Sequence, residues 1–399
     1  MRIDPSETTM IPAILPTYDR APLTFVSGEG SWLREADGSR WLDLGAGIAT
    51  NCLGHAHPAL VEALTEQAGR VWHLSNLYEI APQQALAERL VDATFADTAF
   101  FTNSGTESAE LAIKMVRKHW SDLGEDRPTI LTFEGAFHGR STGAIAAAGP
   151  GKMTRGFGPL MPGFEILPWG DHEALDAALD ESVAAVMVEP IQGEGGIRAM
   201  PDRCLKGLRE ACDRTGALLV LDEVQCGMGR TGRLFAHEWA GIAPDVMMVA
   251  KGIGGGFPLG AVLAAEGAAA GMTVGTHGST YGGNPLGCAV GLKVMEIVGD
   301  PAFLAEVSRK AGRFRQGLEG LVAAHPEVFA GVRGQGLMLG LECVVPNAEI
   351  RRAAEGERLL TVPAAGDVLR LLPALNIEEG DLEEALRRLD AAASTLEAA

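Results

Sequence analysis

The sequence predicts an α/β fold with two parts: a large domain with a mostly parallel sheet flanked by helices, and a smaller α+β domain. The first observation is a series of short apolar runs between residues 99 and 264, several of them separated by segments with helical periodicity. This alternation is typical of βαβ units. The second observation is a change after about residue 290, where a long helical segment precedes strand-like pieces and a final helix.

The expected elements follow that order along the chain. An N-terminal hairpin is predicted from Ser31–Glu35 and Arg40–Leu44, which flank an Asp-Gly turn. Six apolar runs predict strands of the large sheet: Ala99–Thr102, Thr129–Phe133, Ala184–Val188, Ala217–Leu221, Val246–Ala250 and Leu259–Ala264. Helices are expected at Glu107–Lys118 and Pro201–Thr215. The C-terminal part is expected to contain helices at Pro301–Ala323 and Glu378–Glu397 and strands at Gly336–Glu342 and Val368–Leu372.

A chain of 399 residues predicts two or three domains. We expect a large domain over residues 56–290 and a small α+β domain over residues 291–399. The N-terminal segment, residues 1–55, is expected to join the small domain, which would make that domain discontinuous.

Charge and composition argue against several classes of partner. Lys and Arg number 33 and Asp and Glu 52, which gives a net charge of −19. Such a surface repels nucleic-acid phosphates and anionic lipid, so neither partner is expected. The longest stretch without Asp, Glu, Lys or Arg, Gly267 to Leu292, is interrupted by Gly, Thr, Ser, His and Asn, and no membrane span is predicted.

The six cysteines are scattered and form no CxxC pair, so no metal site and no disulfide framework is expected. Free thiols indicate a reducing compartment. The N-terminal residues, MRIDPSETTM, contain no apolar core of an export signal. These observations together predict a cytoplasmic protein.

A candidate phosphate site lies in the segment Ser104-Gly105-Thr106, between an apolar run and a helical segment. Free backbone N–H groups at a helix N-terminus, with two hydroxyls, suit an anion. An ordinary helix N-cap gives the same pattern, so this segment alone does not decide between the two interpretations.

Asp222 and Lys251 each follow an apolar run and are separated by 29 residues, about one strand–helix–strand step. They are therefore expected at the ends of neighbouring strands, where ligand sites of such sheets lie. A partly buried lysine is a nucleophile toward aldehydes, and an acid at this position suits a cationic ring nitrogen. A solvated acid and a lysine at a strand end are the alternatives.

Three further segments supply candidate ligand contacts. Phe137 suits stacking on a planar ring, and Arg140 suits a carboxylate. Glu194 lies on a glycine-rich loop, where a solvated charge is the alternative. Arg370 lies inside an apolar strand, where a charge needs a partner or a ligand. A phosphate site, an aromatic side chain, an acid and a nucleophilic lysine at strand ends of one sheet together predict a pyridoxal phosphate site.

The chain resembles the class III pyridoxal-phosphate aminotransferases over nearly its whole length. The matching segments include NSGTE, AFHGR, EPIQGEGGI, LDEVQCGMGRTG, AKGIGGGFPLGA and HGSTYGGNPL. The resemblance implies the fold type I architecture of pyridoxal-phosphate-dependent transferases. It also implies a homodimer with its active sites at the subunit interface.

The resemblance also implies a role for individual residues. Lys251 would be the Schiff-base lysine, and Asp222 the partner of the ring nitrogen. Gln225 would contact the ring hydroxyl, and Phe137 would stack on the ring. Phosphate would be held by Ser104, Gly105 and Thr106 of one subunit and Thr280 of the other. The residues implied in substrate binding are Tyr18, Arg140, Glu194, Ser279 and Arg370.

For the reaction, the resemblance implies that the side-chain amine of N2-acetyl-L-ornithine is transferred to 2-oxoglutarate, as in arginine biosynthesis. Other donors of the same family stay open: N-succinyl-diaminopimelate, succinylornithine, ornithine and 4-aminobutyrate. Ile48 stands where ornithine aminotransferases carry an aromatic residue, which argues against free ornithine.

Two alternatives lie outside transamination. Gly139-Arg140-Ser141-Thr142-Gly143 matches the G-x-S-x-G pattern of serine hydrolases, but five residues separate the preceding apolar run from this segment. A non-catalytic binding protein with the same fold is expected to have lost Lys251 or Asp222, and both are present.

Overall fold

The computed structural model describes residues 12–398. Residues 1–10, which carry the prediction that no export signal is present, lie outside the described residues. None of the helices within residues 12–398 is long and apolar enough to cross a membrane.

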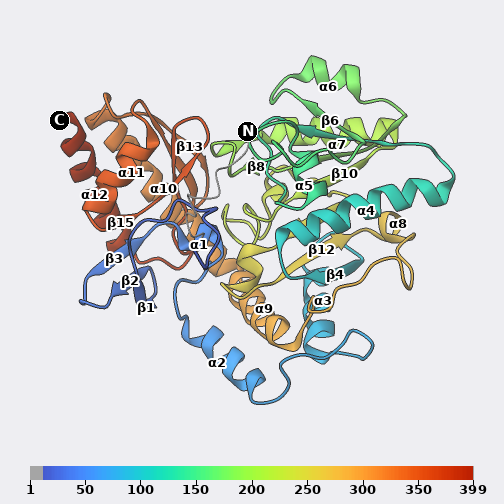
Figure 1. The fold of residues 1–399 in the computed structure, drawn as a ribbon, viewed down its shortest axis with the longest axis horizontal. Helices are drawn as coiled ribbons and strands as arrows, with labels where there is room; N and C mark the ends of the chain where they lie inside the picture. The colour runs from blue at the N-terminus through green and yellow to red at the C-terminus, as the bar shows by residue number, and fades with distance from the viewer. Residues whose placement is uncertain (1–11, 399) are drawn as a thin grey trace, which may run out of the picture.

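The large sheet contains seven strands and forms the right-hand part of the molecule in Figure 1. Their spatial order is β4 (Thr98–Thr102), β12 (Gly260–Ala264), β11 (Val246–Val249), β10 (Leu218–Asp222), β7 (Val183–Val188), β5 (Thr129–Phe133) and β6 (Phe164–Leu167). All run parallel except β12, which is antiparallel to both neighbours. The prediction of a mostly parallel sheet is confirmed. Only ten residues join β11 to β12, too few for the crossover that a parallel pair needs.

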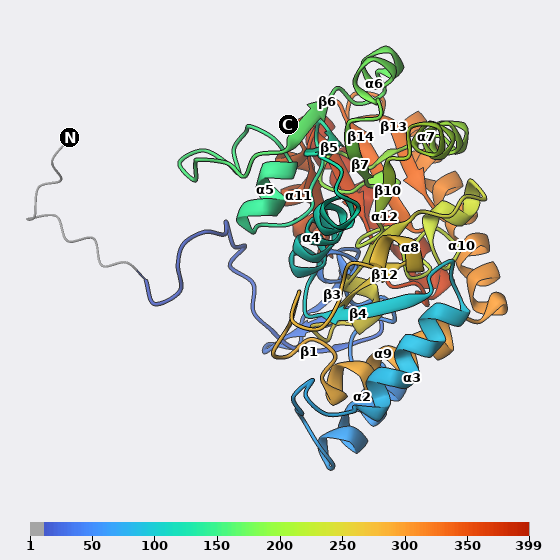
Figure 2. The same cartoon turned by 90° about the vertical axis from the view of Figure 1, so that its right-hand side faces the viewer.

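Helices cover both faces of this sheet, as Figure 2 shows. One face carries α4 (Gly105–Leu123), α5 (Thr142–Ala147) and α8 (Glu266–Ala269), and the other carries α6 (His172–Ala178) and α7 (Asp202–Thr215). The side chains of β10 alternate between them: Val220 packs on the α4 side, and Leu219 and Leu221 on the α7 side. Burial on both faces explains why β10 appears in the sequence as a continuous apolar run.

The second part of the fold combines the two ends of the chain. A sheet of β13 (Phe329–Gln335), β14 (Met338–Cys343), β17 (Val368–Leu371) and β16 (Val362–Ala364) packs with α10 (Pro301–Ala324), α11 (Asn347–Gly356) and α12 (Glu379–Glu397). The N-terminal strands β1 (Phe25–Glu29), β2 (Trp32–Glu35) and β3 (Arg40–Asp43) form another sheet, in which β3 pairs with β15 (Leu359–Leu360). Figure 1 shows these strands beside the C-terminal helices. The division at residues 55 and 290 stays a prediction.

One predicted strand boundary differs from the structure by two residues, and the other strand boundaries differ by at most one. Gly336 does not belong to β14, because it lies at φ +61° in the turn after β13, and the strand begins at Met338. The remaining elements are α1 (Ala46–Ala49), α2 (Pro58–Ala68), α3 (Ala81–Asp92), α9 (Pro285–Val298), the short strands β8 (Ile191–Gln192) and β9 (Arg198–Ala199), and the 3-10 helices η1 (Ala236–Trp239) and η2 (Lys251–Gly254).

Candidate active site

A cavity of about 400 Å³ lies beyond the carboxyl ends of β4, β5, β7, β10 and β11. Most of the residues predicted to bind a cofactor line it: Ser104, Gly105, Thr106, Phe137, Asp222, Gln225 and Lys251, together with Arg140 from the substrate set. This is the edge where a doubly wound sheet places its ligand.

Lys251 begins η2, two residues after the end of β11. Its backbone has φ +48°, an unfavourable conformation for a residue with a long side chain. Such strain is concentrated at functional sites. Burial and the charge of Arg370 lower the pKa of Lys251, while Asp222, Glu194 and Glu189 oppose that shift. The amine is therefore more readily available in its neutral, nucleophilic form than an ordinary lysine.

Asp222 ends β10, in register with Met248 of β11, so it and Lys251 follow neighbouring strands. Its side chain is 4% exposed. Oδ2 lies 2.7 Å from Nδ1 of His138, and Oδ1 accepts the N–H of Val224 at 3.0 Å. Burial opposes protonation of His138, but the hydrogen bond to Asp222 and the charges of Asp222 and Glu189 outweigh it and raise its pKa. The carboxylate of Asp222 is thus held in place from two sides.

Glu189 also lines the cavity, directly after β7. Its carboxylate accepts the N–H groups of Phe137 at 2.9 Å and Gly193 at 3.2 Å. Burial and the nearby Asp222 raise the pKa of Glu189 to about 7, although His138 and the two N–H donors act in the opposite direction.

The N-terminus of α4 opens onto the cavity. Ser104 is its N-cap and accepts the N–H of Glu107. The N–H groups of the first turn have no acceptor within the helix, which suits them to an anion. A Cβ at Gly105 would lie 2.9 Å from Val224 Cγ1, so this close approach requires glycine.

Thr106 fixes the loop that carries Phe137 and Arg140. Its Oγ1 accepts the backbone N–H groups of Arg140 at 3.0 Å and Ser141 at 3.1 Å. Gly139 has φ +133° and passes so close to Thr106 that a Cβ would clash with it. Arg140 is exposed at the rim of the cavity, with its guanidinium 5.5 Å from the centre of the Phe137 ring.

Arg370 and Glu194 adjoin the cavity through Gln225. Arg370 is 1% exposed and bonds Glu194 Oε1 at 2.5 Å and Gln225 Oε1 at 3.2 Å through Nη1. Glu194 is therefore not the solvated loop charge that its glycine-rich surroundings allow. Its side chain is 35% exposed, so it has space to turn away from Arg370.

These features fit the pyridoxal phosphate that the sequence predicts. A helix N-terminus suits the phosphate, Phe137 suits the flat ring, and buried Asp222 suits a protonated ring nitrogen. Lys251, with its lowered pKa, suits attachment to the aldehyde.

Besides Glu194 and Arg370, which adjoin the cavity, three other predicted residues do not line it. Tyr18 is 74% exposed on the N-terminal segment. Ser279 and Thr280 line a separate pocket of about 420 Å³ that shares Asn103 and Thr106 with the cavity. The predicted role of Thr280 is to bind phosphate in the site of the other subunit, and the roles of all three residues stay predictions.

Several residues that line the cavity are not assigned by sequence reasoning, among them His138, Glu189 and Thr50. Glu189 follows an apolar run just as Asp222 does, so the same pattern points to it. His138 is adjacent to Phe137, but only the structure shows its bond to Asp222. Thr50 lies two residues after Ile48, the position that argues against free ornithine, so a signal is present next to it in the sequence.

The geometry does not support the serine hydrolase alternative. Ser141 is the N-cap of α5, and β5 ends at Phe133, so no strand runs into the serine. Its hydroxyl bonds Thr106 at 3.1 Å, whereas His138 bonds Asp222.

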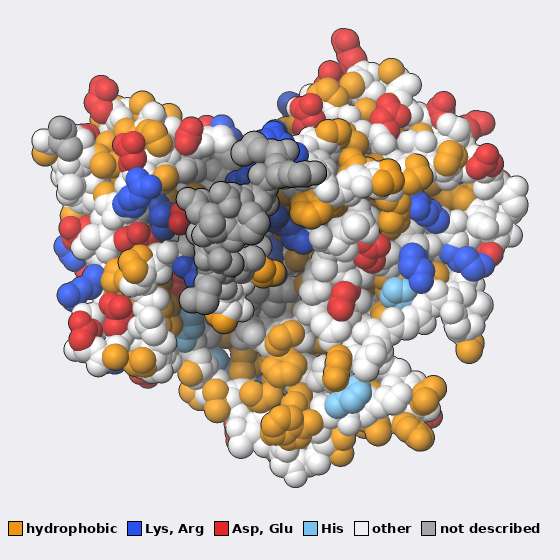
Figure 3. All heavy atoms as spheres, in the orientation of Figure 1, with side chains coloured by type: hydrophobic (Ala, Val, Ile, Leu, Met, Phe, Trp, Pro, Cys, Tyr) orange, Lys and Arg blue, Asp and Glu red, His pale blue; other side chains and the backbone are white. Residues whose placement is uncertain are grey.

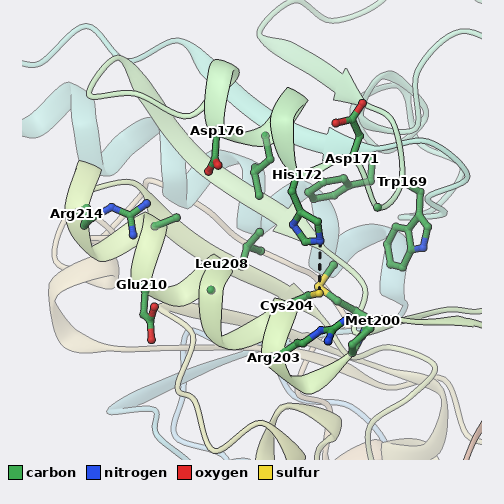
Figure 4. A pocket seen from close by; sticks show the side chains of 16 residues that line it. Trp169, Asp171, His172, Asp176, Met200, Arg203, Cys204, Leu208, Glu210 and Arg214 are labelled. Atoms are coloured by element: carbon green, nitrogen blue, oxygen red, sulfur yellow. Dashed lines mark hydrogen bonds between the residues drawn. The ribbon is translucent and has the colours of Figure 1, made fainter.

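A second cavity of about 440 Å³ lies between α6 and α7, with Phe133 and Trp169 in its wall. In Figure 4 His172 points toward Cys204, and Nε2 lies 3.7 Å from Sγ. None of the predicted site residues lines this second cavity. Within residues 12–398, no cluster of three or more His, Cys, Asp or Glu suited to a metal is found. All six cysteines are free.

The family model described as "Aminotransferase class-III" matches residues 14–393. A Rhodobacter capsulatus protein named acetylornithine aminotransferase is 69% identical over 389 residues, covering 97% of this chain and 99% of that protein. A Brucella melitensis protein of the same name is 52% identical over 392 residues, covering 98% and 97%.

Solved structures give the same picture. The N-acetylornithine aminotransferase of Stenotrophomonas maltophilia K279a is 41% identical, with a TM-score of 0.83 and coverage of 96% of this chain and 98% of that one. An ornithine aminotransferase of Toxoplasma gondii ME49 is 28% identical, with a TM-score of 0.92 and coverage of 97% and 93%. These likenesses confirm the predicted fold type I architecture.

Proposed function

Because the chain belongs to the class III aminotransferases, we propose that it transfers the side-chain amino group of N2-acetyl-L-ornithine to 2-oxoglutarate, with pyridoxal phosphate as cofactor. The products are N-acetyl-L-glutamate 5-semialdehyde and L-glutamate, as in arginine biosynthesis. The observation that carries the proposal is the cavity that joins Lys251, Asp222 and the N-terminus of α4. The names of the relatives at 69% and 52% identity support the substrate.

When bound, pyridoxal phosphate supplies an aldehyde for the amino group and a ring that accepts electrons from the broken C–H bond. Lys251 would hold it through Nζ and would move a proton with the same atom. The Asp222 carboxylate, held by His138, would stabilise a proton on the ring nitrogen. The N–H groups at the start of α4 would bind the phosphate.

The two substrates place their carboxylates differently. Acetylornithine reacts at its side-chain amine, with its carboxylate far from the reacting carbon. Glutamate has one carboxylate far away and one beside the reacting carbon. Arg140, at the rim, binds the far carboxylate in both cases, and Arg370 binds the near one. When acetylornithine is bound, Glu194 neutralises Arg370, as in their 2.5 Å pair.

A panel of amine donors with 2-oxoglutarate tests the proposed substrate. We expect kcat/KM to be highest for acetylornithine, compared with succinylornithine, N-succinyl-diaminopimelate, ornithine and 4-aminobutyrate. A higher kcat/KM for ornithine or 4-aminobutyrate would contradict the proposed donor while leaving the transamination chemistry in place.

We also propose a homodimer in the cytoplasm. Exposed hydrophobic side chains gather on and after α2 and near Thr280: Val61, Val71, Trp72, Leu77, Tyr78 and Tyr281. Figure 3 shows hydrophobic side chains in the lower part of the molecule, where Figure 1 places α2 and α9. A patch of this kind favours association with another protein surface. Six free cysteines are consistent with a reducing compartment.

Arg140→Ala is expected to slow both half-reactions, because both place a far carboxylate at this side chain. Loss of a charge-assisted hydrogen-bonded pair costs about 1.5–3 kcal/mol, or roughly 10- to 150-fold in kcat/KM. Single-turnover rates with acetylornithine and with 2-oxoglutarate measure the two losses. Arg352→Ala on α11 removes an exposed arginine outside the cavity and serves as the control. A loss confined to one half-reaction would contradict a shared carboxylate site.

Arg370→Ala is expected to slow the half-reaction with 2-oxoglutarate more than that with acetylornithine, since only the former has a carboxylate beside the reacting carbon. Glu194→Gln is expected to do the reverse, because it leaves a buried guanidinium unpaired when acetylornithine binds. It also frees Arg370 for α-carboxylates. Rates for each half-reaction in each variant measure this, and equal losses in both would exclude a switch.

A further inference from the structure

The carboxylate of Glu189 joins two loops, each of which carries a residue of the proposed site. One oxygen accepts the N–H of Phe137, the aromatic on the loop after β5. The other oxygen accepts the N–H of Gly193, the residue before Glu194. Glu189 is 5% exposed, so water does not compete for these bonds. A shift of Glu189 therefore moves both loops.

The second of these loops sets the position of Glu194 against Arg370. A Cβ on Gly193 would lie 2.3 Å from Gln225 Oε1, so the loop backbone rests against Gln225. The same oxygen accepts the Arg370 Nη1 hydrogen bond. The carbonyl of Glu194 in turn accepts the N–H of Ala365, in the segment between β16 and β17. The position of the Gly193 backbone therefore determines where the Glu194 side chain lies relative to Arg370.

A carboxylate at this position is unfavourable for folding by itself. It is buried beside Asp222, and burial and that neighbour raise the pKa of Glu189. An amide would avoid the charge, but the two N–H groups bond different oxygens of Glu189, and an amide would place its own NH₂ group at one of these two positions. The hydrogen bonds explain why a carboxylate is present: one oxygen of Glu189 accepts an N–H group from the first loop, and the other oxygen accepts one from the second loop.

We propose that Glu189 is a positioning residue that holds the Phe137 loop and the Glu194–Arg370 pair in register. It thereby sets how well the enzyme accepts a side-chain amine donor relative to an α-amino acid. This inference rests on the proposed function, since it concerns the selectivity of that site.

Glu189→Gln tests the proposal, because its amide accepts one N–H and presents its own N–H to the other donor. The acetylornithine half-reaction should slow about tenfold more than the 2-oxoglutarate half-reaction, in the direction expected for Glu194→Gln. The apoenzyme should also bind pyridoxal phosphate more weakly, measured as Kd by fluorescence titration, because the Phe137 loop loses its anchor. If Glu189→Gln does not fold, Glu189→Asp, one methylene shorter, reaches only one donor and carries the same expectation.

Glu223→Gln is a matched control. Glu223 is 0% exposed and also accepts two backbone N–H groups, those of Ala236 and His237, but it does not line the cavity. The Glu223→Gln variant should have a lower Tm but the same ratio of the two half-reaction rates as the wild type. In the double variant with Glu194→Gln, the effect of Glu189→Gln on that ratio should largely disappear, because both act through the same pair.

The alternative is that Glu189 is dispensable, because Gln192 already ties these loops by donating to the carbonyl of Glu134 at 3.2 Å. The proposal is overturned if Glu189→Gln leaves both the rate ratio and the cofactor Kd as in the wild type. Effects on the ratio that add to those of Glu194→Gln would also overturn it. Failure of the wild type to use acetylornithine is a separate result and contradicts the proposed donor. In that case the cofactor Kd still tests the anchoring of the Phe137 loop.

Discussion

Replacing Lys251 by alanine is expected to abolish nearly all turnover while leaving the fold and cofactor binding in place. The phosphate contacts at α4 and the Asp222 carboxylate do not depend on this side chain. The amine is both the covalent anchor and the proton carrier. Loss of the proton-transfer role alone costs about 10²–10⁴-fold. The anchor is lost as well, so the total loss in kcat should be larger.

The measurement is mass spectrometry of peptides after borohydride reduction, combined with steady-state rates. In the wild type the cofactor mass should appear on the peptide that contains Lys251, and in Lys251→Ala it should be absent. A cofactor mass on any other peptide of the wild type would show that another residue forms the linkage. Alanine keeps the Cβ and therefore the strain of the φ +48° backbone, so Tm is recorded for both proteins and is expected to change little.

Asp222→Asn is expected to preserve the fold and to lower kcat on the order of 10²–10³-fold, the loss typical when one preorganised electrostatic contact is removed. An amide has the same size as the carboxylate but stabilises a protonated ring nitrogen far less. The pKa of His138 should fall as well, because the Asp222 hydrogen bond and charge are among the contributions that raise it. Single-turnover rates and the NMR titration of His138 report the two effects separately.

Asp245→Asn is the matched control for this variant. Asp245 precedes β11 at the opposite end of the sheet, where its carboxylate accepts the N–H of Leu219 and bonds Arg209. It should lower Tm and leave kcat unchanged. A kcat of Asp222→Asn near that of the wild type would remove Asp222 from the chemistry.

The pair Asp222 and Lys251 is predictable from the sequence for a physical reason. Each ends an apolar run that is buried on both faces, and strands buried in this way place their carboxyl ends at one edge. In agreement with this rule, Asp222 pairs in register with Met248 of β11, close to the end of that strand. The same rule predicts the position of Ser104 after β4 and Phe137 after β5.

The hydrogen bonds within the site are not predictable in this way. His138 bonds Asp222 because the loop after β5 turns back through Gly139, at φ +133°, against Thr106. Glu194 meets Arg370 across 176 residues of sequence, which no local pattern encodes. The antiparallel direction of β12, in contrast, follows from the short gap between the apolar runs Val246–Ala250 and Leu259–Ala264, which is visible in the sequence.

The origin of the transferred nitrogen tests the central claim most directly. Acetylornithine labelled with ¹⁵N in its side-chain amine is incubated with the purified enzyme, pyridoxal phosphate and 2-oxoglutarate, and the glutamate is analysed by mass spectrometry. The account predicts that the wild type forms ¹⁵N-glutamate in an amount equal to the aldehyde product and that Lys251→Ala forms almost none. Unlabelled glutamate, or labelled glutamate formed equally fast by Lys251→Ala, would contradict it.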